Sequence, residues 1–309
     1  MTTLFITYQA LLATAKPSLS LYNHPSHYRL QWRQRQLLVK RNNDRAPLHL
    51  PPLENPHWLS ECLQRSPVQL VKLAANLSEA ELEFWANACA SAGKAAFLNV
   101  PNTNELPKKQ QRFKWWLKRL FDWSAALLLL ILLAPIMLVI AGLIGLQSPG
   151  PIFFSQWRVG ERGRLFRLLK FRTMVVGAEQ LHHQVMGCQP GLHKCENDPR
   201  VTAIGRWLRK FSLDELPQLI NVLRGEMSLV GPRPWALFDA LRLNPQVRHR
   251  LSGLPGITGT WQVLARSHLR DLDAATWIDL SYLSNWSIWQ DFKILLMTIP
   301  KVLLGFGAY

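Results

Sequence analysis

Charged residues are scarce in this chain of 309 residues. They make up 18% of it, against about 25% in an ordinary soluble domain, whereas apolar residues make up 48%. This composition excludes intrinsic disorder, collagen and a long coiled coil. Among the charged residues the acidic ones are fewer: there are 20 Asp and Glu and 36 Lys and Arg, which gives a net charge of +16. Such a basic balance predicts an anionic partner, such as nucleic acid, a phosphorylated ligand or an acidic membrane face.

Cysteine is also rare. The four cysteines are too few and too scattered for a disulfide framework, which suits a reducing compartment. Two of them occur in a short cluster with three histidines: His182, His183, Cys188, His193 and Cys195. No tight CxxC pair occurs there, so we expect a polar loop, with a structural zinc site as the alternative. The N-terminus lacks the basic start of a signal peptide, so we expect it to be part of the mature protein.

No charged residue occurs between Trp123 and Trp157. A globular helix does not need to be apolar on every side, so this run predicts a membrane segment. Six basic residues lie within 15 positions on either side, and such residues prefer the cytoplasmic side. Both flanks can be cytoplasmic only if the chain enters and returns, and Pro135 would bend a helix midway. We predict a re-entrant helix hairpin; the alternatives are a tilted span with a proline kink and a buried core helix.

The first third of the chain, residues 1–107, is predicted to be a small α/β domain that contains a loop at Asn42–Pro56. The expected elements are a helix near His57–Gln64, a strand at Ser66–Leu73, a helix opened by a Ser78–Glu81 capping box, and a strand at Ala95–Val100. It contains no pairing of nucleophile and base, no metal-ligand spacing and no glycine-rich phosphate loop. We therefore expect a regulatory or partner-docking role. A linker with the membrane hairpin (108–157) and a catalytic domain (158–309) follow.

The stretch from Arg206 to Pro234 contains the chemically informative residues. Ser212 and Glu215 have capping-box spacing, and Pro217 also favours a helix start nearby. Asp214 and Glu215 would then lie among unpaired N–H groups, where the helix dipole stabilises negative charge. Two adjacent carboxylates near basic residues indicate a nucleophile with a Mg²⁺ site. The alternative is a helix start without catalytic function.

Five blocks of sequence resemble a known family. They are the apolar segment with Pro135, KFRTM at 170–174, SLDELPQ at 212–218, VGPRP at 230–234 and PGITG at 255–259. Together they resemble the bacterial sugar transferases, the monotopic polyprenyl-phosphate phosphoglycosyl transferases, over about residues 112–305. One departure is Ala265, where the family usually has glycine, which leaves the local loop shape open.

The resemblance implies a two-step reaction. Asp214 would attack the β-phosphate of a UDP-sugar and expel UMP, and polyprenyl (undecaprenyl) phosphate would then take the phosphosugar. Glu215 would hold Mg²⁺. Such a reaction initiates synthesis of an exopolysaccharide or surface glycan at the cytoplasmic face of the bacterial inner membrane.

Cationic side chains complete the predicted site. Arg233 lies between two prolines that restrict its backbone, which suits bidentate phosphate recognition. Arg209 matches the family's basic residue five positions before the nucleophile. Lys170 and Arg172 are expected to contact phosphate or lipid headgroups, with a solvated strand face as the alternative. Asp279 resembles a family acidic position and is expected to support the site or lie near the metal, rather than on a helix surface.

The C-terminal stretch has a helical period, with Trp286, Trp289, Phe292 and Leu296 on one side. This stripe fits either a protein core or a helix in the membrane interface.

We therefore predict an α/β (α+β) fold: a helix-rich, membrane-associated catalytic domain with a re-entrant hairpin, plus a small N-terminal α/β domain. The expected partners are a UDP-sugar, polyprenyl phosphate and membrane lipid, but not nucleic acid, because the aromatic residues gather beside the apolar run rather than among solvated basic residues. A homodimer is compatible with the sequence. The rival interpretations are a membrane-anchored binding protein for lipid or nucleic acid, and a catalytically silent scaffold.

Overall fold

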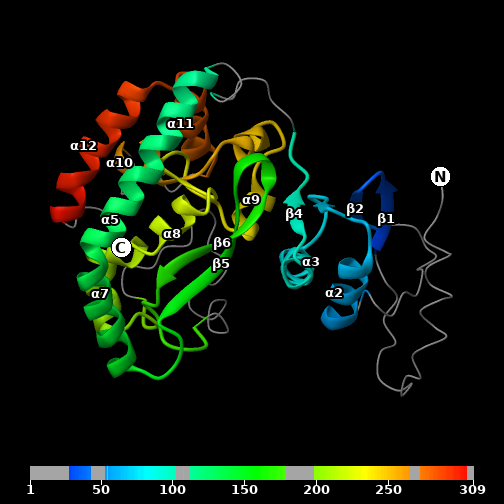
Figure 1. Cartoon of the computed structure of the whole chain (residues 1–309), viewed down its shortest axis with the longest axis horizontal. Coiled ribbons are helices and arrows are strands. Elements are labelled where there is room, and N and C mark those ends of the chain that lie inside the picture. Colours follow the sequence, from blue (N-terminus) through cyan, green and yellow to red (C-terminus); the bar gives the residue numbers. More distant parts are fainter. Residues whose placement is uncertain are drawn as a thin grey trace. The chain divides into compact units, whose positions relative to one another are not determined.

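The computed structural model describes residues 28–42, 55–101, 111–178, 198–264 and 272–304, together with Leu53 and Pro107. The chain divides into two compact units, Met1–Asn99 and Val100–Tyr309 (Figure 1). Helices and strands occur in both, as the predicted mixed fold class requires. The cluster of His182 to Cys195, most of the Asn42–Pro56 loop and Ala265 lie outside the described residues.

The first unit contains a four-stranded sheet in the order β1-β2-β3-β4. Its strands are β1 (Tyr28–Arg33), β2 (Gln36–Arg41), β3 (Leu70–Leu73) and β4 (Ala95–Leu98), and its helices are α2 (Pro56–Arg65) and α3 (Glu79–Ser91). The hairpin of β1 and β2 is antiparallel, and β2, β3 and β4 are parallel. Alternate residues of the last three strands, such as Val39, Val71 and Leu98, are buried, as expected for a sheet with one face against the core.

The predicted elements of this unit are present, with shorter strands. The capping box of α3 is confirmed: Ser78 N donates to Glu81 Oε2 at 2.7 Å, and Glu81 N donates to Ser78 Oγ at 3.3 Å. Strands β1 and β2 were not predicted from the sequence. The side chains of β1 are exposed or half-buried, so its sequence shows little hydrophobic alternation. Strand β2 buries Leu37 and Val39, but Leu38 between them is also apolar, which hides the alternation in the sequence.

The second unit is built along one long helix, α5 (Arg112–Gln147), whose 36 residues include Pro135. The helix is long and apolar enough to cross a membrane, and it is continuous in secondary structure through Pro135. It ends where Ser148, Pro149 and Gly150 follow, since Ser148 has an extended backbone. The charge-free run continues past this end: Phe153–Trp157 lie in a strand of the folded unit, so that part of the predicted membrane segment is wrong. The charge-free sequence therefore continues into a strand whose first five residues are exposed or half-buried in the folded unit.

Short strands and helices make up the rest of the second unit. The strands are β5 (Phe153–Val159) and β6 (Leu165–Phe171), an antiparallel pair, and β7 (Ser228–Val230) and β8 (Gly256–Thr258), a parallel pair. The helices are α7 (Ala203–Lys210), α8 (Gln218–Leu223), α9 (Leu237–Arg242), α10 (Thr260–Leu264), α11 (Leu272–Ser284) and α12 (Ile288–Leu304), with the 3₁₀ turns η2 (Glu161–Gly163), η3 (Leu213–Glu215) and η4 (Arg248–Ser252).

Two apolar clusters contact different parts of α5. One joins Trp115 and Ala126 of α5 to β6, α8, β7 and α12, and the other joins Ile140 and Ile144 to Phe171 and Leu208. The helix therefore packs on the folded unit both near its start and near its end.

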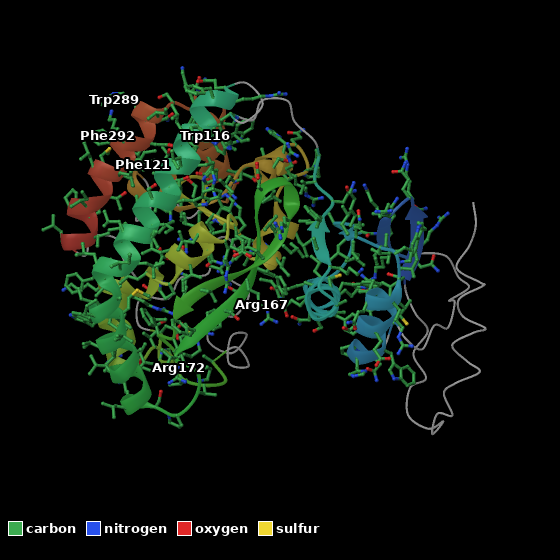
Figure 2. The ribbon with its side chains drawn as sticks, in the orientation of Figure 1. Trp116, Phe121, Arg167, Arg172, Trp289 and Phe292 are labelled. Carbon is green, nitrogen blue, oxygen red and sulfur yellow. The ribbon has the colours of Figure 1, made fainter. Side chains whose placement is uncertain are left out.

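The C-terminal stripe divides between two environments. Trp286 is buried between α11 and α12, whereas Trp289 is 73% exposed on α12. Phe292 and Leu296 are also exposed. A single core stripe is therefore wrong for this segment, because the chain turns between two helices just where the periodic pattern continues. Figure 2 shows Trp289 and Phe292 on α12, and Trp116 and Phe121 on α5.

Candidate active site

The two adjacent acids lie in η3, directly after α7. Ser212, which lies between α7 and η3, has a left-handed backbone with φ of 54° and makes no side-chain cap hydrogen bond. The predicted capping box at Ser212 is therefore wrong: the chain turns sharply from α7 into η3, and the next helix, α8, starts only after Pro217. A left-handed backbone in a residue other than glycine costs about 1–2 kcal/mol. Such strain persists where the surrounding structure imposes it, often at functional sites.

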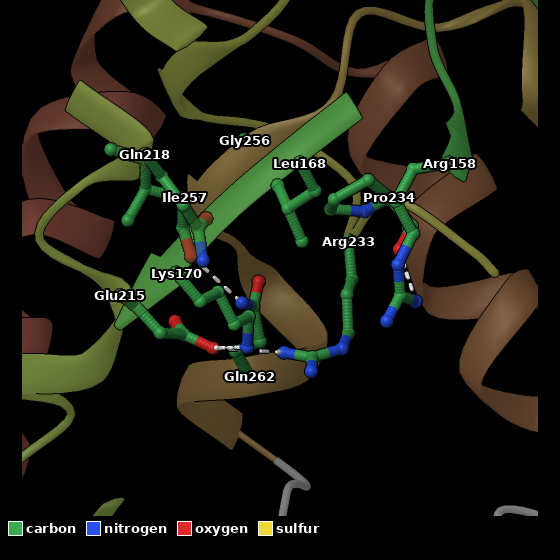
Figure 3. A pocket seen from close by; sticks show the side chains of 10 residues that line it. All are labelled: Arg158, Leu168, Lys170, Glu215, Gln218, Arg233, Pro234, Gly256, Ile257 and Gln262. Carbon is green, nitrogen blue, oxygen red and sulfur yellow. Dashed lines mark hydrogen bonds and ion pairs between the residues drawn. The ribbon is translucent and has the colours of Figure 1, made fainter. Parts of the chain in front are cut away.

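Both acids are nearly buried, and a lysine of β6 bridges them. Lys170 Nζ lies 2.7 Å from Glu215 Oε1 and 3.9 Å from Asp214 Oδ2. Arg233 adds a second cation, with Nη1 3.8 Å from Glu215 Oε1 (Figure 3). Four of the predicted site residues therefore lie together, from three segments that are far apart in sequence.

The loop of Arg233 is fixed by backbone hydrogen bonds between β7 and β8. Gly231 N donates to Thr258 O at 2.9 Å, and Gly256 N donates to Pro232 O at 2.9 Å. The strands approach so closely that a Cβ atom at Gly256 would lie 2.0 Å from Gly231 N. Glycine is therefore required at this crossing.

Asp279 lies behind the Arg233 loop and is bonded to Arg250. The Arg250 guanidinium donates to the Asp279 carboxylate and, through Nη2, to Arg233 O at 2.6 Å. Burial raises the pKa of Asp279, and the charge of Arg250 opposes that shift. The structure thus places Asp279 against a buried arginine that holds the backbone of Arg233, not on an exposed helix face.

Arg209 reaches the site from α7. Because Gly205 has no Cβ, α7 lies directly on the backbone of Thr173, and Arg209 Nε donates to Thr173 Oγ1 at 2.9 Å. Burial lowers the pKa of Arg209, and the charges of Asp214 and Asp198 act in the opposite direction. Arg209 therefore contributes positive charge on the Asp214 side of the acid pair.

Arg172 lies elsewhere. Its guanidinium donates to Ser148 O at 2.7 Å, to Ser148 Oγ at 2.9 Å and to Pro149 O at 3.0 Å, at the end of α5 (Figure 2). The structure does not bring Arg172 together with the acid pair, although Lys170 is only two residues away. Strand β6 ends at Phe171, so the alternation that would place both side chains on one face stops before Arg172.

A cavity open to solvent, with about 210 Å³ of empty space, lies beside Lys170, Glu215 and Arg233. Its lining residues are Arg158, Leu168, Lys170, Glu215, Gln218, Arg233, Pro234, Gly256, Ile257 and Gln262 (Figure 3). Arg158, Gln218 and Gln262 were not predicted as site residues from the sequence. Gln218 is the last residue of the SLDELPQ block, which was the only signal available for it. Three cationic side chains, Arg158, Lys170 and Arg233, line the cavity together with the Glu215 carboxylate, an arrangement suited to a substrate with several phosphate oxygens.

The residues fit a magnesium ion that shares its ligands with a phosphorylated substrate. Among the described residues, no group of three or more His, Cys, Asp or Glu side chains could hold a metal. Mg²⁺ typically takes one or two carboxylates, together with water and substrate phosphates. Asp214 and Glu215, adjacent and facing cations, match that smaller donor set.

Comparison with known proteins agrees with the five sequence blocks. A family model described as bacterial sugar transferase matches residues 113–305. The chain belongs to the bacterial sugar transferase family. All of the acid pair, the cations and the cavity-lining residues of this family member lie within the matched range.

Curated relatives of this sugar transferase family member match the same part of the chain. A galactosyl transferase CpsE of Streptococcus agalactiae is 44% identical over 197 residues, 62% of this chain and 43% of the relative. An undecaprenyl-phosphate galactose phosphotransferase of Salmonella typhimurium is 40% identical over 213 residues, 67% of this chain and 44% of the relative. The exopolysaccharide production protein ExoY of Sinorhizobium fredii is 42% identical over 202 residues, 62% of this chain and 88% of the relative. The chain thus spans less than half the length of the first two.

Proposed function

We propose that this protein transfers a phosphosugar from a UDP-sugar to polyprenyl (undecaprenyl) phosphate, releases UMP, and thereby initiates synthesis of an exopolysaccharide or surface glycan. The single observation that carries the proposal is the acid pair at the cationic cavity: Lys170 Nζ lies 2.7 Å from Glu215 and 3.9 Å from Asp214. Names of relatives such as undecaprenyl-phosphate galactose phosphotransferase support the substrate classes.

The reaction has two displacements at phosphorus. A carboxylate oxygen of Asp214 attacks the β-phosphorus, the bond to the bridging oxygen breaks, and its electron pair leaves on UMP. An oxygen of the polyprenyl phosphate then attacks the same phosphorus, the bond to Asp214 breaks, and the carboxylate is regenerated. No proton must be removed, because both attacking groups are anionic oxygens.

The surrounding side chains stabilise the charges of these steps. Before the donor binds, the Lys170 ammonium group pairs with the carboxylates of Asp214 and Glu215. When the donor is bound, it can pair with the phosphate oxygens instead. Arg233, on a loop whose backbone is fixed, presents a planar guanidinium to phosphate oxygens. Arg209 adds positive charge on the Asp214 side. Glu215 would hold Mg²⁺ with Asp214 nearby, and the bound ion would neutralise diphosphate charge.

Helix α5 supports a membrane position for this site at the cytoplasmic face of the inner membrane. A 36-residue helix is about 54 Å long, yet both ends are bonded to the same folded unit. Near its start, Lys118 Nζ donates to Val230 O at 3.1 Å, and at its end Ser148 O accepts from Arg172. A straight crossing would separate the two ends by the bilayer. We therefore propose that α5, although continuous through Pro135, enters and leaves the membrane on the same side.

Exposed apolar side chains mark the part of α5 that would contact lipid. The side chains more than 60% exposed in its middle and last turns are Leu128, Ile131, Leu132, Leu138, Val139 and Leu146. Aromatic side chains of α5 and α12, such as Trp116 and Trp289, are also exposed (Figure 2). Trp is favoured at the boundary between lipid and water. This surface would hold the cavity close to a lipid phosphate.

The experiment uses the purified full chain in lipid nanodiscs with Mg²⁺, UDP-sugars and undecaprenyl phosphate. We expect UMP release with at least one donor, and a labelled phosphosugar trapped on the protein when the acceptor is omitted. Asp214→Asn should abolish both signals, whereas Asp273→Asn, an exposed acid on α11, should retain them. UMP release unaffected by Asp214→Asn would refute the nucleophile assignment.

The membrane arrangement has its own test. Single cysteines at Lys109→Cys and Arg164→Cys, in a background without other cysteines, should both react with an impermeant maleimide only from the cytoplasmic side. Labelling from opposite sides would replace re-entry with a true span.

A further inference from the structure

Charged side chains are buried in the first turns of α5, among the basic residues that precede the apolar run. Lys118 is 5% exposed and Asp122 is 1% exposed. Asp291 of α12, 7% exposed, completes the group. Burying charges is costly unless each is paired and hydrogen-bonded. Lys118, Asp122 and Asp291 are here called the buried charge cluster. Its burial is favourable only if its partners compensate for that cost.

The buried charge cluster is fully engaged. Lys118 Nζ lies 2.6 Å from Asp291 Oδ2, and Asp291 also accepts from Tyr282 Oη at 2.6 Å and from Trp286 Nε1 at 3.1 Å. Asp122 Oδ2 accepts from Arg119 Nη1 at 3.3 Å. The charges are thus arranged as one network that joins α5 to α11 and α12.

The same network holds strand β7. Asp122 Oδ1 accepts from Leu229 N at 3.2 Å, and Asp122 Oδ2 accepts from Ser228 Oγ at 2.7 Å. Lys118 Nζ donates to Val230 O at 3.1 Å. Strand β7 pairs with β8, and each of its three residues also forms a hydrogen bond with a side chain of α5.

Strand β7 leads directly into the phosphate-binding loop. Val230 is only three residues before Arg233, and the link between them contains Gly231 and Pro232. Proline has a fixed φ, and Gly231 is bonded to Thr258. A displacement of β7 would therefore shift Arg233 relative to Glu215 rather than be absorbed by the loop.

We propose that Lys118, Asp122 and Asp291 are positioning residues that fix β7, and through it Arg233, against the donor cavity. The helix that would enter the membrane and the loop that binds the donor phosphates then form one mechanical unit. The inference rests on the proposed function for its kinetic readout. It assigns the first turns of α5 to the catalytic unit, whereas the apolar turns that follow are assigned to lipid.

A purely stabilising role makes a different prediction. It would lower the amount of folded enzyme and leave the donor KM of the folded fraction unchanged. A positioning role raises the donor KM, because even a small misplacement of a binding group can cost orders of magnitude. The donor KM of the folded enzyme therefore separates the two roles.

The test compares Lys118→Met with Lys114→Met, which changes an exposed lysine one turn earlier on the same helix. Both variants are measured in nanodiscs for UMP release against donor concentration, with active sites counted by covalent trapping. We expect Lys118→Met to raise the donor KM by about tenfold or more, and Lys114→Met to leave it at the wild-type value. A wild-type donor KM in Lys118→Met overturns the proposal, whatever happens to its thermal stability.

A second pair of variants tests the proposal even if Lys118→Met does not fold. Asp122→Asn keeps an acceptor for Leu229 N and should retain most donor binding. Asp122→Leu removes the acceptors for both Leu229 N and Ser228 Oγ and should weaken donor binding. Hydrogen–deuterium exchange of the peptide spanning residues 227–234 gives a readout without activity. Faster exchange there in Asp122→Leu than in Asp122→Asn supports the proposal, and equal exchange overturns it. Absence of UMP release by the wild-type protein would refute the proposed function, while the exchange result still decides the positioning role.

Discussion

The variant Gly256→Ala tests whether the close approach of β7 and β8 shapes the donor cavity. A Cβ atom at this position would lie 2.0 Å from Gly231 N and 2.6 Å from Thr258 O. Ordinary van der Waals contact begins at 3.4 Å, so the first contact is about 1.4 Å too short. Both neighbours are backbone atoms, and no side-chain rotation relieves the overlap. The two strands must therefore move apart.

The cost follows from the bonds that cross this point. Overpacking a well-packed site costs about 1–3 kcal/mol. Weakening of the bonds from Gly256 N to Pro232 O and from Gly231 N to Thr258 O adds about 1 kcal/mol each if both are lost. We expect the free energy of unfolding to fall by about 3 kcal/mol, which lowers the unfolding midpoint by about 6–12 °C. The donor KM should rise as well, because Gly256 and Arg233 line the same cavity.

The assay is thermal unfolding in nanodiscs, followed by the tryptophan fluorescence of this chain with 13 Trp. Gly142→Ala on α5 is the matched control, since nothing lies within 4 Å of its added Cβ atom and alanine favours a helix. The control should not be less stable than the wild type. An unchanged unfolding midpoint and donor KM in Gly256→Ala would refute the reasoning, because they would mean that the strands are free to separate.

Three further predictions concern single side chains. Lys170→Met should lower kcat for UMP release by about 10²-fold, as expected when a charge-stabilising group is removed; a rate near that of the wild type would exclude Lys170 from the reaction. Asp279→Asn leaves the buried Arg250 without its carboxylate and should lower the free energy of unfolding by about 3–5 kcal/mol, measured by denaturant titration. An unchanged free energy of unfolding would contradict a stabilising ion pair. Burial raises the pKa of Cys89 to about 12, so the thiolate fraction at pH 8 is about 10⁻⁴. Peptide mapping by mass spectrometry should therefore find Cys89 alkylated by iodoacetamide only after denaturation, and modification of the folded protein would contradict its burial.

Local patterns in the sequence predicted local structure well where neighbours in sequence are also neighbours in space. The Ser78–Glu81 capping box is such a case, since its two hydrogen bonds close within one helical turn. The same spacing failed at Ser212, because that residue connects α7 to η3 in a left-handed conformation. Spacing alone does not distinguish a helix start from a sharp turn between two helices.

The candidate site was predictable only in part. Asp214 and Glu215 are adjacent, so any fold keeps them together, and the prolines around Arg233 pointed to a rigid loop. The partners of Asp279 were not readable, because Arg250 lies 29 residues away. Gln262 and Arg158 likewise reach the cavity from segments without a distinctive motif.

The sequence by itself determined the long apolar helix, the acid pair and the family of this protein, because composition and contiguous motifs express them. The tertiary structure alone decided which cations serve the acids. It directs Lys170 to Glu215 and Arg172 to the end of α5, and it buries Lys118 against a strand 112 residues away. The physical reason is that the energy of a charge depends on burial and on partners, and the path of the chain brings those partners together over distances that local spacing does not encode.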